Sequence, residues 1–378
     1  MAEPTEPRRR RIVFFLTVVP VILLAATGFV SVTWSRFSGA SGLVWQLLPL
    51  LLSAGFIPLT LLSRRHYNPV LRIVYTISAI WLGLLSFSLV AAIGCWIVAG
   101  AAAVSGLSLD QRGLAAVFFG GAILATVYGV ANAAWVRVTR VTVSLRNLPV
   151  AWEGRSVALV TDLHLGNIRG YRFVRRLVGR LRALQPEAVF ISGDMFDGTK
   201  VGADDLVAPW RDFQVPAGIY FVSGNHEEFG DRGPYLAAIQ RAGIRVLNNE
   251  KTTIRGLQLV GVHDAEAGEP QLFSRILRAA ELDPSQASIL LTHQPANLSV
   301  PQEAGISLQL SGHTHGGQFW PWNRVAAKVH KQFVYGLNRF GSLLVLTSGG
   351  AGTWGPPLRV GTRAEIVLIR LEAAGQAR

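Results

Sequence analysis

The N-terminal third of the chain contains four long runs without a single Asp, Glu, Lys or Arg, and they constrain the fold most. The runs are Ile12–Ser35, Phe37–Ser63, Ile73–Leu109 and Gly113–Val136. Each is long enough to cross a membrane, because a helix needs about 20 apolar residues to span the hydrocarbon core. The sequence therefore predicts an α-helical transmembrane region with about four helices, at residues 12–35, 41–63, 73–99 and 113–136. A fifth, short or re-entrant helix within residues 100–109 is the alternative, and it would invert the topology.

The arginines around these runs predict the orientation. With four helices, one side of the membrane holds two arginines, Arg36 and Arg112, and the other side holds Arg8, Arg9, Arg10, Arg11, Arg64, Arg65, Arg72, Arg137, Arg140 and Arg146. Lys and Arg favour the cytoplasmic side. We therefore expect a multi-pass protein of the cell (plasma or inner) membrane, with a basic N-terminus (residues 1–11) and the C-terminal domain in the cytoplasm. The basic N-terminus also resembles a secretion signal, but three further apolar runs argue against simple cleavage.

Composition narrows the class of protein. Hydrophobic residues make up 50% and charged residues 16% of the chain, which favours a membrane protein. The net charge of +13 suits anionic lipid or phosphorylated substrates, and equally a positive-inside topology with ordinary surface arginines; we expect no nucleic-acid partner. The single cysteine, Cys95, excludes an intrachain disulfide. The apolar runs lack the charged residues that transporters often use, so we interpret them as an anchor.

Beyond a linker and first strand at residues 137–150, five short apolar runs each stop at a cluster of His, Asp or Asn. The clusters are Asp162-Leu-His164, Asp194-Met-Phe-Asp197, Asn225-His226-Glu227, His293 and His313-Thr-His315. Helical patterns at residues 171–184, 232–242 and 271–280 separate some of the runs, which predicts an α/β layered domain. In such domains, sites form beyond the carboxyl ends of the strands. All five clusters fall at such positions.

These residue types are suited to a pair of divalent metals. Five of the eight histidines lie in the clusters. Imidazole and carboxylate ligands suit Mn, Fe or Zn, and two such ions about 3.5–4 Å apart can activate water and bind a phosphoryl oxygen. In Asp-x-His and His-x-His, alternate residues of an extended segment point the same way, so each pair can face one site. The glycines before Asp194, Asn225 and His313 permit tight turns off the strands.

The ordered clusters resemble the calcineurin-like metallophosphoesterase superfamily over about residues 150–370. Gly312-His-Thr-His-Gly-Gly-Gln318 and the later segment Ser348–Arg359 are similar to its membrane-associated bacterial branch. The resemblance implies a β-sandwich of mixed sheets flanked by helices at residues 151–372. It also implies that a hydroxide bridging two metal ions hydrolyses a phosphodiester or phosphomonoester. Mn, Fe or Zn fit that role best, with Mg as the alternative.

The resemblance also implies a role for individual residues. Asp162, His164 and His315 would hold the first metal. Asn225, His293 and His313 would hold the second, and Asp194 would bridge the two. The catalytic set would be His226, Asp194 and Glu227, with His226 stabilising the phosphoryl oxygens or protonating the leaving group and Glu227 orienting it. Asp197 matches the second acid of the Gly-Asp-x-x-Asp motif and is interpreted as a supporting residue.

Substrate contacts are less sharply indicated. Arg172 and Arg176 lie in an arginine-rich segment. One hypothesis is that this segment contacts anionic lipid or substrate phosphate, and the other is that it forms a solvated helix face. His263 is a substrate contact or a structural residue. Trp320, within Phe319–Trp322, reaches the membrane interface or an acyl chain, or packs under the site. The membrane anchor favours a lipid or lipid-linked phosphoester. The alternative is a non-catalytic metal-binding membrane sensor or scaffold, against which His226 argues, because such a protein would not need it.

Overall fold

The computed structural model describes residues 6–40, 42–199, 202–229 and 231–375. The chain forms two compact units: Met1–Ala131 with Gly355–Leu358, and Asn132–Trp354 with Arg359–Arg378. Residues 1–5 of the predicted basic N-terminus lie outside the described residues.

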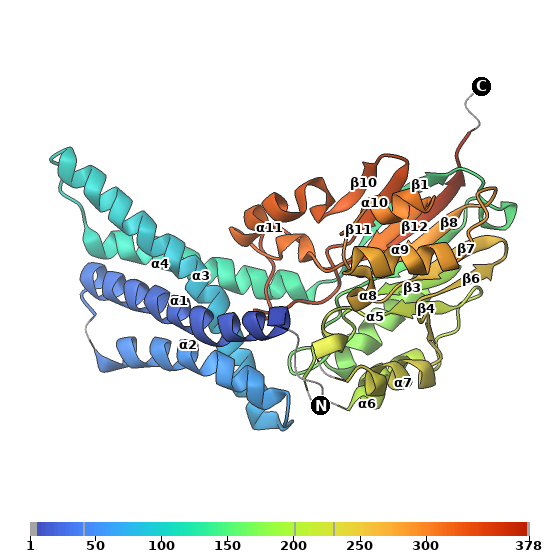
Figure 1. The fold of residues 1–378 in the computed structure, drawn as a ribbon. Helices are drawn as coiled ribbons and strands as arrows, with labels where there is room; N and C mark the ends of the chain where they lie inside the picture. The colour runs from blue at the N-terminus through green and yellow to red at the C-terminus, as the bar shows by residue number, and fades with distance from the viewer. Residues whose placement is uncertain (1–5, 41, 200–201, 230, 376–378) are drawn as a thin grey trace. The chain divides into compact units, whose positions relative to one another are not determined.

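Among the described residues, the first unit contains four long helices, which Figure 1 labels α1 to α4. They are α1 (Glu6–Ser38), α2 (Leu43–Ser63), α3 (Pro69–Val104) and α4 (Gln111–Ala134). All four are long and apolar enough to cross a membrane, which confirms the predicted helical class of this region.

The helix ends differ from the expected ranges, most clearly in α3. This helix begins at Pro69 because Asn68 caps it: the Asn68 side chain accepts a hydrogen bond from the Leu71 N–H at 2.8 Å. It continues through residues 100–104, which we expected to be a loop, because alanine has the highest helix propensity. Residues 105–110, all of which the structure describes, are not helical, so a fifth helix is not formed there.

Small polar contacts join the apolar helices α1, α2 and α3. Ser53 Oγ lies 2.7 Å from Thr27 Oγ1 and accepts a hydrogen bond from Trp81 Nε1 at 2.8 Å. Trp96 Nε1 donates to Thr33 Oγ1 at 3.0 Å. Thr27, Thr33 and Ser53 are buried. In apolar surroundings such groups must find partners, so these contacts select how the helices face one another.

The second unit is built on two six-stranded mixed sheets. The first has the order β1 (Arg137–Leu145), β12 (Glu365–Ala373), β2 (Ser156–Val160), β3 (Ala188–Ser192), β4 (Ile219–Val222) and β5 (Arg245–Val246). The second has the order β10 (Gly336–Phe340), β11 (Leu343–Thr347), β9 (Leu308–Ser311), β8 (Ser288–Leu291), β7 (Leu257–Gly261) and β6 (Glu250–Ile254). β2 to β5 are parallel to one another, as are β7, β8, β9 and β11.

Helices surround these sheets. They are α5 (Tyr171–Leu184), α6 (Ala203–Val207), α7 (Gly233–Arg241), α8 (Asp264–Ala267), α9 (Pro270–Ala279), α10 (Ser299–Glu303) and α11 (Trp322–His330). The described residues also form short 3-10 helices, which are η1 (Val150–Trp152), η2 (Ala208–Trp210), η3 (Glu227–Phe229), η4 (His315–Gly317) and η5 (Lys331–Val334).

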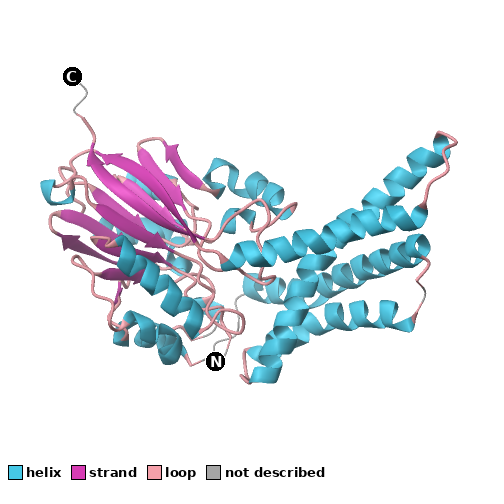
Figure 2. Cartoon of the chain, turned by 180° about the vertical axis from the view of Figure 1, so that it is seen from behind, coloured by secondary structure: helices cyan, strands magenta, loops and turns pink. Residues whose placement is uncertain are grey.

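The sheets stack face to face, with helices on both outer sides (Figures 1 and 2). Side chains from both sheets, including Phe190 and Ile289, form the central core. A second core lies between the first sheet and α5 to α7, and a third between the second sheet and α9. The layered sandwich flanked by helices is therefore confirmed.

Helix α5 has the predicted range and apolar face. Phe173, Val174, Leu177, Val178 and Leu181 are buried against the first sheet. The arginines between them are exposed: Arg172, Arg175, Arg176, Arg180 and Arg182.

Trp152 tests the central core, because its ring is fully buried and its Nε1 donates to the Ile254 carbonyl at 2.9 Å. We expect Trp152→Ala to reduce the free energy of unfolding by about 3–5 kcal/mol, from lost burial and the cavity left behind. Trp152→Phe should cost clearly less. Thermal unfolding of the purified protein, followed by circular dichroism, measures both. Equal melting of wild type and Trp152→Ala would contradict this description of the core.

Candidate metal centre

Sequence-predicted ligands from both sheets meet at one edge of the sandwich. Asp162 and His164 follow β2, Asp194 follows β3, and Asn225 and His226 follow β4. The second sheet supplies the histidines that follow β8 and β9, which are His293, His313 and His315. The parallel strands end at a common edge in each sheet, so stacking the sheets brings the two sets of loops together.

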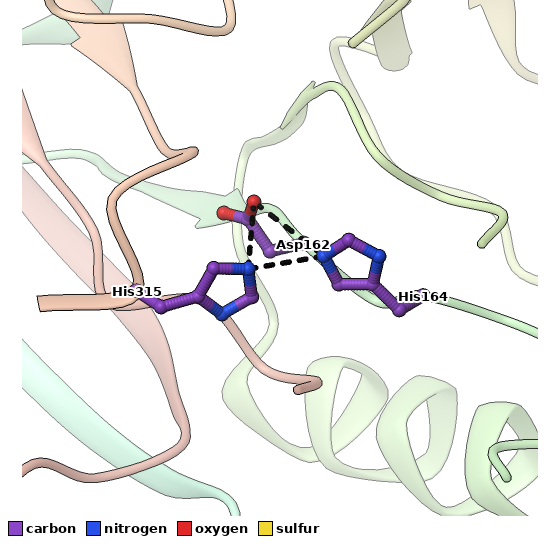
Figure 3. Close-up of side chains that lie close together, drawn as sticks. All are labelled: Asp162, His164 and His315. Atoms are coloured by element: carbon purple, nitrogen blue, oxygen red, sulfur yellow. Dashed lines mark hydrogen bonds and ion pairs between the residues drawn. The ribbon is translucent and has the colours of Figure 1, made fainter. Parts of the chain in front are cut away.

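The first group of donor atoms comprises Asp162, His164 and His315 (Figure 3). His164 Nε2 lies 3.0 Å from His315 Nε2 and 3.9 Å from Asp162 Oδ1. His315 Nε2 lies 3.5 Å from the same Asp162 oxygen. The three side chains converge on one point, although His315 is about 150 residues from the other two in sequence.

The second group comprises Asp194, His293 and His313, with Asn225 beside it. His293 Nε2 lies 3.1 Å from Asp194 Oδ2 and 3.2 Å from His313 Nδ1. Asn225 Oδ1 lies 3.0 Å from His313 Nδ1. The other nitrogen of His293, Nδ1, lies 2.8 Å from the Ser192 carbonyl, to which it donates when protonated. That hydrogen bond leaves the Nε2 lone pair facing the group.

Asp194 lies between the two groups. Its Oδ2 is 3.1 Å from His293 Nε2 in the second group and 3.7 Å from His164 Nε2 in the first. Its Oδ1 accepts a hydrogen bond from the His226 backbone N–H at 2.9 Å. One oxygen therefore faces both groups, while the other fixes the carboxylate in place.

The donor set fits divalent metal ions. Bonds of about 2.0–2.2 Å to one ion place neighbouring ligand atoms about 3.0–3.6 Å apart, close to most of the separations observed here. Burial lowers the pKa of His313 to about 3 and the pKa values of His164 and His315 well below the ordinary value. These imidazoles are therefore neutral and keep the lone pair that a metal needs.

The carboxylates in the site are strongly perturbed. Burial raises the pKa of Asp162 to about 6. Burial also raises the pKa of Asp194, but the charge of His293 outweighs it and holds that pKa well below its ordinary value. Backbone N–H groups stabilise both carboxylates. The His313 N–H lies 3.1 and 3.0 Å from the two Asp162 oxygens, and the His226 N–H donates to Asp194. His293 supplies one counter-charge to these carboxylates, and bound cations would supply more.

The backbone of the site is also unusual. Five of the predicted ligands have a positive φ, between 47° and 68°: Asp162, His164, Asp194, His313 and His315. Asp and His tolerate this left-handed region better than most residues do. A Cβ added to Gly224 would overlap Asp194 Oδ1, and one added to Gly312 would overlap Thr161 and Asp162. These glycines are therefore required by close approach as well as by turn geometry.

His226 forms a third possible donor group with His164 and Asp194. Its Nδ1 is 3.1 Å from the Asp197 carbonyl, and its ring is edge-on to His164 at 4.6 Å between centroids. Phe229 packs against it at 4.4 Å. Asp197 thus supports His226 through its backbone oxygen, while its carboxylate accepts the Thr199 N–H at 2.9 Å.

Glu227 does not orient His226 as expected. Its fully buried carboxylate accepts backbone N–H bonds from Asp194 at 3.0 Å, Phe196 at 2.8 Å and Gly224 at 2.8 Å. Burial and the charge of Asp194 raise its pKa to about 8. Glu227 therefore ties the loop after β3 to the loop after β4.

Arg359 is a site residue whose role the sequence did not indicate. Its side chain is fully buried. Its Nη2 donates to the carbonyls of Gly349 at 2.5 Å and Gly352 at 2.8 Å, and its Nη1 donates to the His315 carbonyl at 3.2 Å. Backbone carbonyls leave no signal in residue type, so only the fold reveals this role.

The residues predicted to contact substrate do not lie together in the structure. His263 is fully buried: its Nδ1 accepts the Ser223 N–H at 2.8 Å and its Nε2 lies 3.2 Å from Asn248 Oδ1. Both ring nitrogens thus face protein groups, which contradicts a substrate contact and agrees with the structural alternative. Arg172 and Arg176 lie on the exposed face of α5, outside the donor groups. Trp320 is 42% exposed.

Comparisons with known proteins identify a family and several relatives that this chain resembles. Residues 155–317 match the family described as calcineurin-like phosphoesterase. The chain is 32% identical to an uncharacterized metallophosphoesterase of Helicobacter pylori, over 58% of this chain and 60% of that protein. It is 31% identical to an uncharacterized metallophosphoesterase of Campylobacter jejuni, over 62% and 63%. It is 33% identical to a transmembrane protein with metallophosphoesterase domain of Bos taurus, over 66% and 60%. The chain thus spans about three fifths of the length of these relatives.

Gly224→Ala tests the close packing at Asp194. The added methyl would overlap the Asp194 carboxylate, so we expect metal affinity to fall about 10–100-fold, as for other changes in residues that support ligands. Gly179→Ala on α5 is the matched control, since a Cβ there meets nothing within 4 Å. Metal content after dialysis, measured by mass spectrometry, reports both. Full metal content in Gly224→Ala would contradict the predicted geometry.

Proposed function

Because the chain belongs to the calcineurin-like metallophosphoesterases, as its motifs predicted, we propose that it is a membrane-anchored enzyme that hydrolyses a phosphodiester or phosphomonoester with two divalent metal ions. The observation that carries this proposal is the position of Asp194 Oδ2, within 4 Å of a donor nitrogen in each group. A single carboxylate oxygen in that position can serve two cations.

We assign the first metal to Asp162, His164 and His315, and Asp194 to both metals. The second metal is assigned to Asn225, His293 and His313. This mixture of imidazole and oxygen donors favours Mn, Fe or Zn over Mg. Bound there, such ions supply Lewis acidity and lower the pKa of a coordinated water.

His226 is the proposed acid. Hydrogen bonding of Nδ1–H to the Asp197 carbonyl would fix the ring and reserve Nε2 for the substrate. In the doubly protonated form of His226, the Nε2–H would donate to a phosphoryl oxygen or protonate the leaving oxygen. Glu227 contributes indirectly, by holding the backbone of Asp194 and Gly224 in position. This positioning role replaces the orienting role that the sequence predicted for it.

The proposed anchor supports a lipid or lipid-linked substrate, because it would concentrate the enzyme at a bilayer. Four apolar helices and the similarity to a bovine transmembrane protein support membrane association. Exposed Arg172 and Arg176 on α5 could attract anionic headgroups. The alternative is a metal-binding sensor or scaffold, in which His226 would serve only as a further donor beside His164 and Asp194.

Activity can be tested with the purified full-length protein. After metal removal, we expect no turnover of chromogenic phosphodiesters or monoesters, and recovery when Mn, Fe or Zn is restored. His226→Gln should reduce kcat about 10²–10⁴-fold with metal content unchanged, because the proton donor is lost. Asp194→Asn should lose both metal and activity. A folded, two-metal protein that turns over no ester tested would support the sensor or scaffold instead.

Orientation is tested separately by labelling. We expect a cysteine at exposed Arg241, introduced into Cys95→Ala protein, to react with a membrane-impermeant maleimide only after cells are permeabilised. Labelling of intact cells would place the domain outside and contradict the arginine asymmetry.

A further inference from the structure

Helix α11 (Trp322–His330) follows the ligand segment His313–His315 almost directly, yet it contributes nothing to the apolar core. None of its nine residues, all of which the structure describes, is buried. A globular-domain helix normally hides one apolar stripe. Helix α11 also has an apolar stripe, but it is on the surface.

The stripe consists of Trp322, Val325 and Val329, which are spaced three and four residues apart and so share one face of the helix. Their exposed fractions are 49%, 51% and 69%. A different side of α11 packs on η4, where a Cβ at Gly317 would come within 2.9 Å of Ala326 Cβ. The helix is therefore held against the site by one side while the stripe remains exposed.

The surroundings of the stripe are basic. Arg324, Lys328 and Lys331 are exposed within or just after the helix. Residues 304–364 contain no Asp or Glu at all, although they include α11 and the neighbouring strand β10. On β10, exposed Leu337 and Arg339 continue the combination of apolar and basic side chains.

We propose that this surface, Trp322, Val325 and Val329 with Arg324 and Lys328, lies on an anionic bilayer. Trp favours the membrane–water interface, and an apolar helix face bordered by Lys and Arg suits the boundary between headgroups and acyl chains. The lack of acidic residues fits anionic lipid by charge complementarity. A second copy of this basic surface, by contrast, would meet like charge.

This bilayer contact would favour lipid-borne substrates for the proposed enzyme, and that consequence rests on the proposed function. Helix α11 ends at His330, whose ring centroid lies 6.2 Å from that of His313, and it packs on η4, which begins at His315. A bilayer held against α11 would bring phosphoesters of its headgroups beside the donor groups. Lipid-borne substrates would then reach the site without leaving the membrane surface.

Site-specific fluorescence tests the contact without any assay of activity. Full-length Cys95→Ala protein carries a single cysteine in place of Val329, labelled with an environment-sensitive dye. The labelled protein is reconstituted into nanodiscs of phosphatidylglycerol and phosphatidylcholine, with one copy in each disc. We expect quenching by doxyl-labelled phospholipid and protection from aqueous iodide. The matched control, Val150→Cys, replaces a valine that is 91% exposed, and it should show the reverse.

Charge reversal gives a second measurement. Arg324→Glu with Lys328→Glu should abolish most of the doxyl quenching at position 329 in anionic discs. A dye at position 329 that iodide quenches fully would overturn the proposal. Protection from iodide without doxyl quenching would also overturn it, since protein would then cover the stripe. Because neither readout needs turnover, failure of the bilayer contact is distinguishable from failure of the proposed hydrolysis.

Discussion

The apolar core between the two sheets is the constraint on which the candidate metal centre depends. One sheet supplies Asp162, His164 and Asp194, and the other supplies His293 and His315. The shortest donor contacts cross between these sets: 3.0 Å for the two Nε2 atoms of the first group, and 3.1 Å between His293 and Asp194. Because protein interiors are close-packed, side chains such as Phe190 fix the sheet separation and, with it, the spacing of the donors. The centre is thus a property of the sandwich and not of any one loop.

This arrangement buries carboxylates, which is unfavourable for the free energy of folding, and backbone N–H groups offset much of that penalty. A buried carboxylate is stable only if it is paired or hydrogen-bonded. Asp162 receives the His313 N–H and Asp194 receives the His226 N–H. Glu227 accepts three N–H groups. The imidazoles of His164, His313 and His315 are neutral, whereas the carboxylates, above all Asp194, raise the pKa of His293 well above its ordinary value against the opposing effect of burial. Bound cations would stabilise these lone pairs and carboxylates together.

Much of the fold and of the site was predictable from local pattern. Strand-length apolar runs that end in Asp, His or Asn gave the ligand candidates, and the 3.6-residue period gave α5 with its correct bounds. The supporting residues were harder to predict. Arg359 binds carbonyl groups of residues 349 and 352, and Glu227 binds backbone N–H groups. His263 was a candidate substrate contact or structural residue, and its ring nitrogens face Ser223 and Asn248. Partners that are backbone atoms or distant side chains leave no trace in residue type.

The sequence by itself determined the four apolar helices and the candidate donor residues, because absence of charge over about 20 residues and strand-end clusters are local properties. Only the tertiary structure decided which donors share a group, since His164 and His315 meet across the sandwich at a separation of 151 residues. It also decided that Asp194 lies between the groups, and that α11 presents its apolar stripe outward rather than to the core. These facts depend on how the sheets and helices pack, and packing is set by contacts between segments that no local pattern relates.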